Sequence, residues 1–181
     1  MRDTKLALYL HLVWGTWDRL PLITSEIERH LHRNLVNEVQ RQECSLLAIG
    51  GTEDHIHLLV SLPSTLSIAQ LVKQLKGVSS HFVNNELTRE TPFKWQGAYG
   101  AFTVSRWDTD RILNYIQHQK EHHTHNTLMP ELELLDDNSS LHLAHTITVS
   151  SKEITLPKSN APSAQADGRR HARSRDFNRR A

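Results

Sequence analysis

Residues 53–63 read EDHIHLLVSLP, and this stretch decides the fold because it combines a strand pattern with two histidines. On an extended chain alternate side chains share a face, so His55 and His57 point to one side of a sheet. Ile56 and Leu58 then point to the other side, toward a core. The Cα atoms of the two histidines are about 7 Å apart, so both imidazoles can lean onto one metal ion. The alternative interpretation is a half-exposed strand with polar residues on its wet face.

The residues around this stretch alternate between strand patterns and helix patterns. Apolar residues recur at every second position in 6–14 and at four-residue steps in 26–43, which indicates a strand and then an amphipathic helix. The expected elements, in chain order, are strand 6–14, helix 26–43, strands 46–51 and 55–62, helix 67–82, strand 95–105 and a last helix that opens near 108–110 and runs past Tyr115. This β-α-β-β-α-β order predicts a ferredoxin-like α+β fold, with two helices packed on an antiparallel sheet and a C-terminal helix that bears the tyrosine.

The composition divides the chain into three parts. We expect a single domain over 1–130, a poorly defined extension over 131–156 and a disordered basic tail over 157–181. The tail holds seven Lys or Arg against two Asp and can add nonspecific attraction to phosphates. The rest of the chain holds 14 basic and 18 acidic residues, so it is mildly acidic while the tail is basic.

Several classes of protein are excluded. The apolar run LALYLHLVWGTW is too short to span a bilayer and lacks a cleavage site for secretion, so we expect no membrane association. A single cysteine, Cys44, excludes an internal disulfide and fits a cytoplasmic protein. No glycine-rich phosphate loop is present, so no nucleotide cofactor is expected.

A second polar pattern lies in the last helix, where residues 114–123 read NYIQHQKEHH. Tyr115, His118, Gln119 and His122 follow i, i+3, i+4, i+7 spacing, which places them on one helical face. The face is either a solvent-exposed polar surface or the source of a nucleophile and a metal ligand beside the paired histidines.

Four motifs carry a resemblance to the single-tyrosine transposases of the HUH endonuclease superfamily, which include the REP-associated tyrosine transposases. In chain order they are LHLVWGTWDRLPLI, DHIHLLVSLP, WQGAYGAFTVS and NYIQHQKEHH. The resemblance covers about residues 5–125 and does not extend into the tail.

The resemblance implies a metal-dependent enzyme that binds hairpin DNA, nicks the single strand beside the hairpin and rejoins it. By resemblance, His55 and His57 hold Mg²⁺ or Mn²⁺, and Gln119 completes the metal site. Tyr115 attacks the scissile phosphate, which leaves a 5′-phosphotyrosine and a free 3′-OH. We expect both histidines and the tyrosine on the solvent-facing side of the sheet. In this family the tyrosine serves its own subunit or a partner's, which leaves a homodimer open.

The residues of 114–123 also offer candidates for the third metal ligand and for contacts with DNA. An amide oxygen from Gln119 suits Mg²⁺, whereas His122 lies one turn further from Tyr115 and offers nitrogen. We therefore expect His122 or His123 to contact DNA. The candidate DNA-binding residues are Lys73, Lys76, Lys94, Arg106 and His122.

Two other functions fit parts of the pattern. One is a catalytically idle DNA-binding descendant of the same family. The other is an RNA-binding ferredoxin-like domain, but such modules read bases with paired aromatics on a central strand. The corresponding strand here reads HIHLLV and has no aromatic residue.

Overall fold

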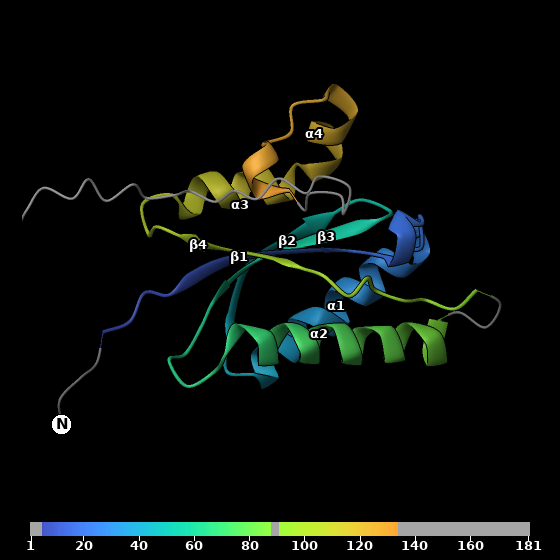
Figure 1. The fold of residues 1–181 in the computed structure, drawn as a ribbon, viewed down its shortest axis with the longest axis horizontal. Helices are drawn as coiled ribbons and strands as arrows, with labels where there is room; N and C mark the ends of the chain where they lie inside the picture. The colour runs from blue at the N-terminus through green and yellow to red at the C-terminus, as the bar shows by residue number, and fades with distance from the viewer. Residues whose placement is uncertain (1–4, 88–90, 134–181) are drawn as a thin grey trace, which may run out of the picture. The chain divides into compact units, whose positions relative to one another are not determined.

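The computed structural model describes residues 5–87 and 91–133, which form a four-stranded antiparallel sheet and the helices around it (Figure 1). The strands lie in the order β2-β3-β1-β4, so β1 and β3 are the central pair. The strands are β1 (Tyr9–Gly15), β2 (Ser45–Gly51), β3 (His55–Ser61) and β4 (Gly100–Val104). The helices are α1 (Ser25–Arg41), α2 (Ile68–Phe82), α3 (Thr109–Gln117) and α4 (Gln119–His125). The short helical turns are η1 (Trp17–Arg19), η2 (Val83–Leu87) and η3 (Pro130–Leu132).

This element order confirms the predicted ferredoxin-like fold with its additional C-terminal helix. Figure 1 shows α1 and α2 on one face of the sheet and α3 and α4 on the other. None of the helices within the described residues is long and apolar enough to cross a membrane. The extension and the tail that the sequence predicts lie outside the described residues, apart from 131–133.

The larger core lies between the sheet and the pair α1 and α2. Leu10, Leu12 and Trp14 of β1 point into it and are at most 6% exposed. They alternate along the strand as the apolar pattern predicts. The buried helix residues recur one turn apart and pack against them; they are Ile27, Leu31, Leu35 and Val39 of α1 and Leu71, Val72 and Leu75 of α2.

Each of these helices follows an N-cap residue with a side-chain hydroxyl, Thr24 for α1 and Ser67 for α2. The Thr24 side chain accepts a hydrogen bond from the backbone N–H of Ile27 at 3.4 Å. Ser67 forms a capping box with Gln70, in which each side chain satisfies the other's backbone N–H. The caps fix where α1 and α2 start, and the apolar residues one turn apart decide which of their faces meets the sheet.

The opposite face of the sheet is also covered, and this corrects one expectation. His55 and His57 are fully buried and Tyr115 is 2% exposed, so the prediction that they lie on a wet face is wrong. The cause is a second apolar cluster, in which Ile112 and Ile116 of α3 pack on the sheet with Leu132. The helix that carries the tyrosine thus closes over the histidines instead of standing beside them.

A glycine permits this close approach of α3 to β2. A Cβ atom added to Gly50 would lie 2.0 Å from the backbone oxygen of Ile116, which is far inside van der Waals contact. Any side chain at position 50 would therefore push α3, and with it Tyr115, away from the sheet.

The C-terminal helix and the last strand differ in detail from the prediction. The helix begins at Thr109 and passes Tyr115 as expected, but it breaks at His118, where φ is −107° and ψ is 23°. The break leaves His118 exposed while Gln119 is buried, so the four-residue stripe does not form one face. The predicted strand 95–105 is shortened to β4, although Trp95 still makes an isolated bridge to Thr16.

Candidate active site

The centre of the candidate site is the histidine pair on β3. His55 and His57 lie near the start of this strand, opposite Gly15 and Val13 of β1. Their ring centroids are 5.0 Å apart and the ring planes are nearly perpendicular at 75°. Strand alternation places both rings on one face of the sheet, as the sequence predicts, and α3 covers that face.

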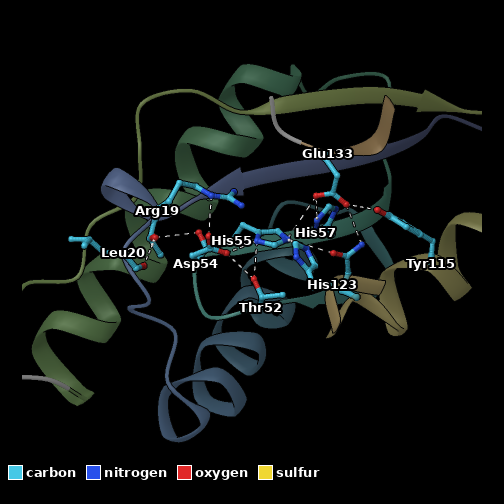
Figure 2. A network of polar contacts seen from close by, with 11 residues as sticks. Arg19, Leu20, Thr52, Asp54, His55, His57, Tyr115, His123 and Glu133 are labelled. Carbon is cyan, nitrogen blue, oxygen red and sulfur yellow. Dashed lines mark hydrogen bonds and ion pairs between the residues drawn. The ribbon is translucent and has the colours of Figure 1, made fainter. Parts of the chain in front are cut away.

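A network of hydrogen bonds and an ion pair, centred on Asp54, fixes the ring of His55 (Figure 2). Its Nδ1 lies 2.6 Å from Oδ1 of Asp54 and 2.8 Å from the hydroxyl oxygen of Thr52. Arg19 forms an ion pair with Asp54 at 3.0 Å. Burial alone would raise the pKa of Asp54, but the hydrogen bonds from His55 and Thr52, with the charges of His55 and Arg19, lower it to about 2. The ionised carboxylate accepts the Nδ1–H of His55, so Nε2 is the ring nitrogen that faces the site.

His57 has a neutral partner instead. Its Nδ1 lies 2.8 Å from Nε2 of His11, and the two rings stack at 5.0 Å. Burial, and secondarily the charge of His57, lowers the pKa of His11 to about 3. Burial also lowers the pKa of His57, although Glu133 partly opposes this. Burial therefore disfavours the protonated form of both rings.

The nucleophile candidate faces the histidines from α3. The ring of Tyr115 lies edge-on to that of His57, with centroids 6.3 Å apart. The phenol O–H donates a hydrogen bond to Oε1 of Glu133, and the phenol oxygen accepts one from the backbone N–H of Met129 at 3.2 Å. Burial, followed by the hydrogen bond to Glu133, raises the pKa of Tyr115 to about 12. The hydroxyl is thus held protonated in this arrangement.

Gln119, the expected third ligand, lies at the start of α4 and is 1% exposed. Its side-chain oxygen is 3.4 Å from Nε2 of His55, and its side-chain N–H donates to Oε1 of Glu133 at 3.5 Å. The amide therefore contacts both His55 and Glu133. The structure thus brings Gln119 beside His55, and its role as the third metal ligand stays a prediction.

Glu133 is the functional candidate that sequence reasoning missed. Its Oε2 lies 3.4 Å from Nε2 of His57 and 3.8 Å from Nε2 of His55. Burial would raise the pKa of Glu133, but the adjacent His57 ring, followed by the hydrogen bond from Tyr115, lowers it to about 2. The available signal was the acidic run PELELLDD after the helix, which has no periodicity that selects one carboxylate.

The two neighbouring histidines of α4 take different positions. Nε2 of His123 is 3.2 Å from Nε2 of His55, so His123 reaches the histidine pair. The ring of His122 lies over Tyr115 at 4.8 Å, and its Nδ1 is hydrogen-bonded to the hydroxyl of Thr127 at 2.9 Å. His118 turns away and contacts the backbone oxygen of Asn114 at 2.8 Å.

The predicted DNA-binding residues other than His122 lie outside α3 and α4. Lys73 is exposed on α2, whereas Lys76 uses its ammonium group to bind the backbone oxygens of residues 96, 97 and 98 at 2.5–3.2 Å. All three N–H donors of Lys76 are thereby satisfied within the protein, so it shapes the loop before β4. Lys94 lies 3.3 Å over the ring of Trp17, and Arg106 lies 4.6 Å from the ring of Trp107.

The donor set of the site fits a divalent metal ion. Nitrogen and oxygen atoms of His55, His57 and Glu133 lie within 4.8 Å of one another. Nε2 of His57 is buried and has no hydrogen-bond partner among the residues that the structure describes. The carboxylate and the amide oxygen beside this nitrogen are ligand types that suit Mg²⁺ and Mn²⁺.

A ferredoxin-like sheet with paired histidines on a central strand, closed by a helix that carries a tyrosine, is the arrangement expected of a single-tyrosine transposase. Residues 4–119 match the family model described as "Transposase IS200 like". The chain therefore belongs to the IS200-like family of transposases, enzymes that cut and rejoin DNA. This confirms the resemblance that the sequence motifs carry.

Curated relatives and solved structures agree with this assignment. The chain is 30% identical over 127 residues to the ISDra2 transposase TnpA of Deinococcus radiodurans, covering 66% of this chain and 91% of that protein. It is 30% identical over 100 residues to the transposase for insertion sequence element IS200 of Salmonella typhimurium, covering 49% of this chain and 64% of that protein.

Two solved structures share the fold. A putative transposase from Deinococcus radiodurans superposes with a TM-score of 0.53 at 25% identity, covering 66% of this chain and 98% of that one. A REP-associated tyrosine transposase bound to a REP hairpin superposes with a TM-score of 0.51 at 12% identity, covering 71% and 76% of the two chains.

Proposed function

We propose that this transposase cleaves single-stranded DNA beside a hairpin, with Tyr115 as the nucleophile and a divalent metal ion bound by His55 and His57. The observation that carries the proposal is the convergence of these side chains on one carboxylate. The hydroxyl of Tyr115 is hydrogen-bonded to Glu133, and Nε2 of His57 lies 3.4 Å from the other oxygen of the same group. The hydroxyl of Tyr115 and the Nε2 atom of His57 thus each contact one oxygen of the same carboxylate.

Tyr115 performs the covalent step. Its oxygen bonds to phosphorus while the bond from phosphorus to the 3′-oxygen breaks, which gives a 5′-phosphotyrosine and a 3′-OH. The phenol proton passes to Glu133, which already accepts its hydrogen bond, and the departing 3′-oxygen takes up a proton from water to become the 3′-OH. Attack by a 3′-OH on the phosphotyrosine reverses the exchange and returns the proton to Tyr115, so strands are joined without a nucleotide cofactor.

The ligands proposed for the ion are Nε2 of His55 and of His57, with oxygen from Gln119 or Glu133. When bound there, Mg²⁺ or Mn²⁺ polarises the phosphoryl group and offsets the negative charge that attack creates. The amide oxygen of Gln119 lies 3.4 Å from Nε2 of His55, and Oε2 of Glu133 lies 3.4 Å from Nε2 of His57, so either oxygen is close to the histidine pair.

Aromatic rings paired with cations form the proposed DNA surface. Trp107 is 82% exposed beside Arg106, and Trp17 is 42% exposed beneath Lys94. An exposed aromatic ring stacks on an unpaired base while the adjacent cation binds phosphate. The match to a REP-associated tyrosine transposase bound to a REP hairpin supports hairpin DNA as the substrate class.

The experiment is covalent capture of labelled DNA. Single-stranded hairpins made from inverted repeats that flank the gene are labelled at the 5′ or the 3′ end and incubated with Mg²⁺ or Mn²⁺. We expect the 3′-labelled strand to become attached to the protein and the 5′-labelled strand to be released. Tyr115→Phe should abolish attachment while hairpin binding is retained, and Tyr99→Phe is the matched control because Tyr99 is 38% exposed. Wild-type attachment in Tyr115→Phe would refute the proposal.

A further inference from the structure

His11 is a buried histidine to which the proposed reaction assigns no role. It lies on β1 at 0% exposure, and its Nε2 is 2.8 Å from Nδ1 of His57 on β3. The two rings are stacked with planes 9° apart. Phe102 of β4 stacks on His11 with centroids 5.7 Å apart, so the imidazole is held between rings of both neighbouring strands.

Packing alone does not account for a histidine at this position. Nδ1 of His11 has no hydrogen-bond partner among the described residues, although the side chain is fully buried. An apolar ring would fill the same space without leaving a buried nitrogen unpaired, which is unfavourable. The polar contact that His11 does make in the described part of the chain is with His57, so the reason for its polarity lies there.

The chemistry of metal binding explains that contact. A ligand nitrogen must present a lone pair, and Nε2 of His57 is the nitrogen that faces Glu133 at 3.4 Å. The proton of a neutral His57 ring must then be on Nδ1, where it needs an acceptor. Nε2 of His11 is that acceptor when His11 carries its own proton on Nδ1.

We propose that His11 is a positioning residue that holds His57 in the tautomer and ring orientation required to bind the metal ion. The inference rests on the proposed function, because it takes His57 as a metal ligand. Its neutral imidazole contrasts with the partner of His55, the carboxylate of Asp54 at 2.6 Å. A carboxylate partner raises the basicity of a ligand histidine, so the two ligands differ in donor strength.

The test measures Mn²⁺ binding to the full-length, DNA-free protein, by the electron paramagnetic resonance signal of free Mn²⁺. His11→Phe keeps a flat ring but removes the acceptor, and we expect it to weaken Mn²⁺ binding by about 10–100-fold. His11→Gln restores an acceptor and should recover most of the affinity. Phe102→Leu is the packing control, because it changes the contact with His11 without touching the hydrogen bond, and it should bind Mn²⁺ like the wild type.

Wild-type affinity in His11→Phe would overturn the inference, and so would equal losses in His11→Phe and Phe102→Leu. His57→Ala separates this from the proposed function: if His57→Ala binds Mn²⁺ normally, the metal site itself is wrong. If His57→Ala loses Mn²⁺ binding while His11→Phe binds normally, the role of His11 is rejected and the metal site stands. Nitrogen-15 spectra of the Mg²⁺-loaded wild type give a readout that needs no variant, with the proton expected on Nδ1 of His57 and absent from Nε2 of His11. A proton on Nε2 of His11 would overturn the inference.

Discussion

The hydroxyl of Tyr115 donates a hydrogen bond to the carboxylate of Glu133, which in turn faces the buried histidine pair. The backbone of the same segment, at Met129, donates to the phenol oxygen. The nucleophile of the proposed reaction is therefore held by residues 129–133. These residues lie beyond residue 119, where the match to the family model ends.

Removing the carboxylate should make Tyr115 easier to ionise. Burial is the larger cause of its raised pKa of about 12 and remains in Glu133→Gln, whereas the second cause, the hydrogen bond to an anionic acceptor, is lost. We expect the pKa of Tyr115 in metal-free Glu133→Gln to fall below about 12 while staying above 10.0, the ordinary value for tyrosine. Ultraviolet difference titration against a Tyr115→Phe reference measures it. Glu131→Gln, at an exposed neighbouring position, is the control, and an unchanged pKa in Glu133→Gln would contradict the role given to this bond.

The third metal ligand can be assigned by metal titration of cleavage. Gln119 places its oxygen 3.4 Å from Nε2 of His55, whereas His122 is directed to Thr127 and the Tyr115 ring. Gln119→Ala should therefore raise the Mg²⁺ concentration needed for half-maximal cleavage, by about tenfold for a lost ligand contact. His122→Ala should leave that concentration nearly unchanged. The reverse pattern would assign the ligand to His122.

Mixing two inactive variants tests whether one subunit supplies the whole site. In the described chain the rings of His57 and Tyr115 lie 6.3 Å apart, so the tyrosine faces the histidines of its own chain. A mixture of His57→Ala and Tyr115→Phe should stay inactive, because a chain with the intact nucleophile lacks an intact metal site. Each variant with added wild-type protein serves as the control for folding and DNA binding. Cleavage restored by the mixture alone would mean that Tyr115 acts on a partner's histidines.

The order of elements could be predicted because it depends on local patterns. Alternation along β1 and β3 and the four-residue steps in α1 reflect which side chains meet the core, and strand geometry alone puts His55 and His57 on one face. The hydrogen bonds that cap α1 and α2, at Thr24 and Ser67, likewise join residues only three positions apart.

Features that depend on distant packing could not be predicted in this way. The burial of His55 arises because α3 folds over the sheet, and no pattern in the strand itself reports it. The break at His118 turns His123, and not His122, toward the histidine pair. Glu133 lies 18 residues from Tyr115 in an acidic run without periodicity, so no spacing rule connects the two.

The approach of α3 to the sheet predicts an effect on stability. Gly50→Ala would place a Cβ atom 2.0 Å from the backbone oxygen of Ile116, so the helix must shift. We expect the free energy of unfolding to fall by about 1–3 kcal/mol, the range typical of overpacked sites, and cleavage to decrease because Tyr115 moves with α3. Gly77→Ala is the matched control on α2, because no atom lies within 4 Å of its added Cβ, and it should be neutral or slightly stabilising. Denaturant unfolding measures both, and equal stability of the two variants would contradict the packing described here.

The central claim is that Tyr115 becomes covalently bound to the 5′ phosphate of cleaved DNA, and mass spectrometry of the trapped adduct tests it most directly. Trypsin releases residues 112–120, ILNYIQHQK, in which Tyr115 is the sole tyrosine. After nuclease trimming, the account predicts this peptide with a nucleotide attached through its 5′ phosphate at Tyr115, and no such adduct when His57→Ala is treated in the same way. A nucleotide attached at any other residue, or through a 3′ phosphate, would contradict the account.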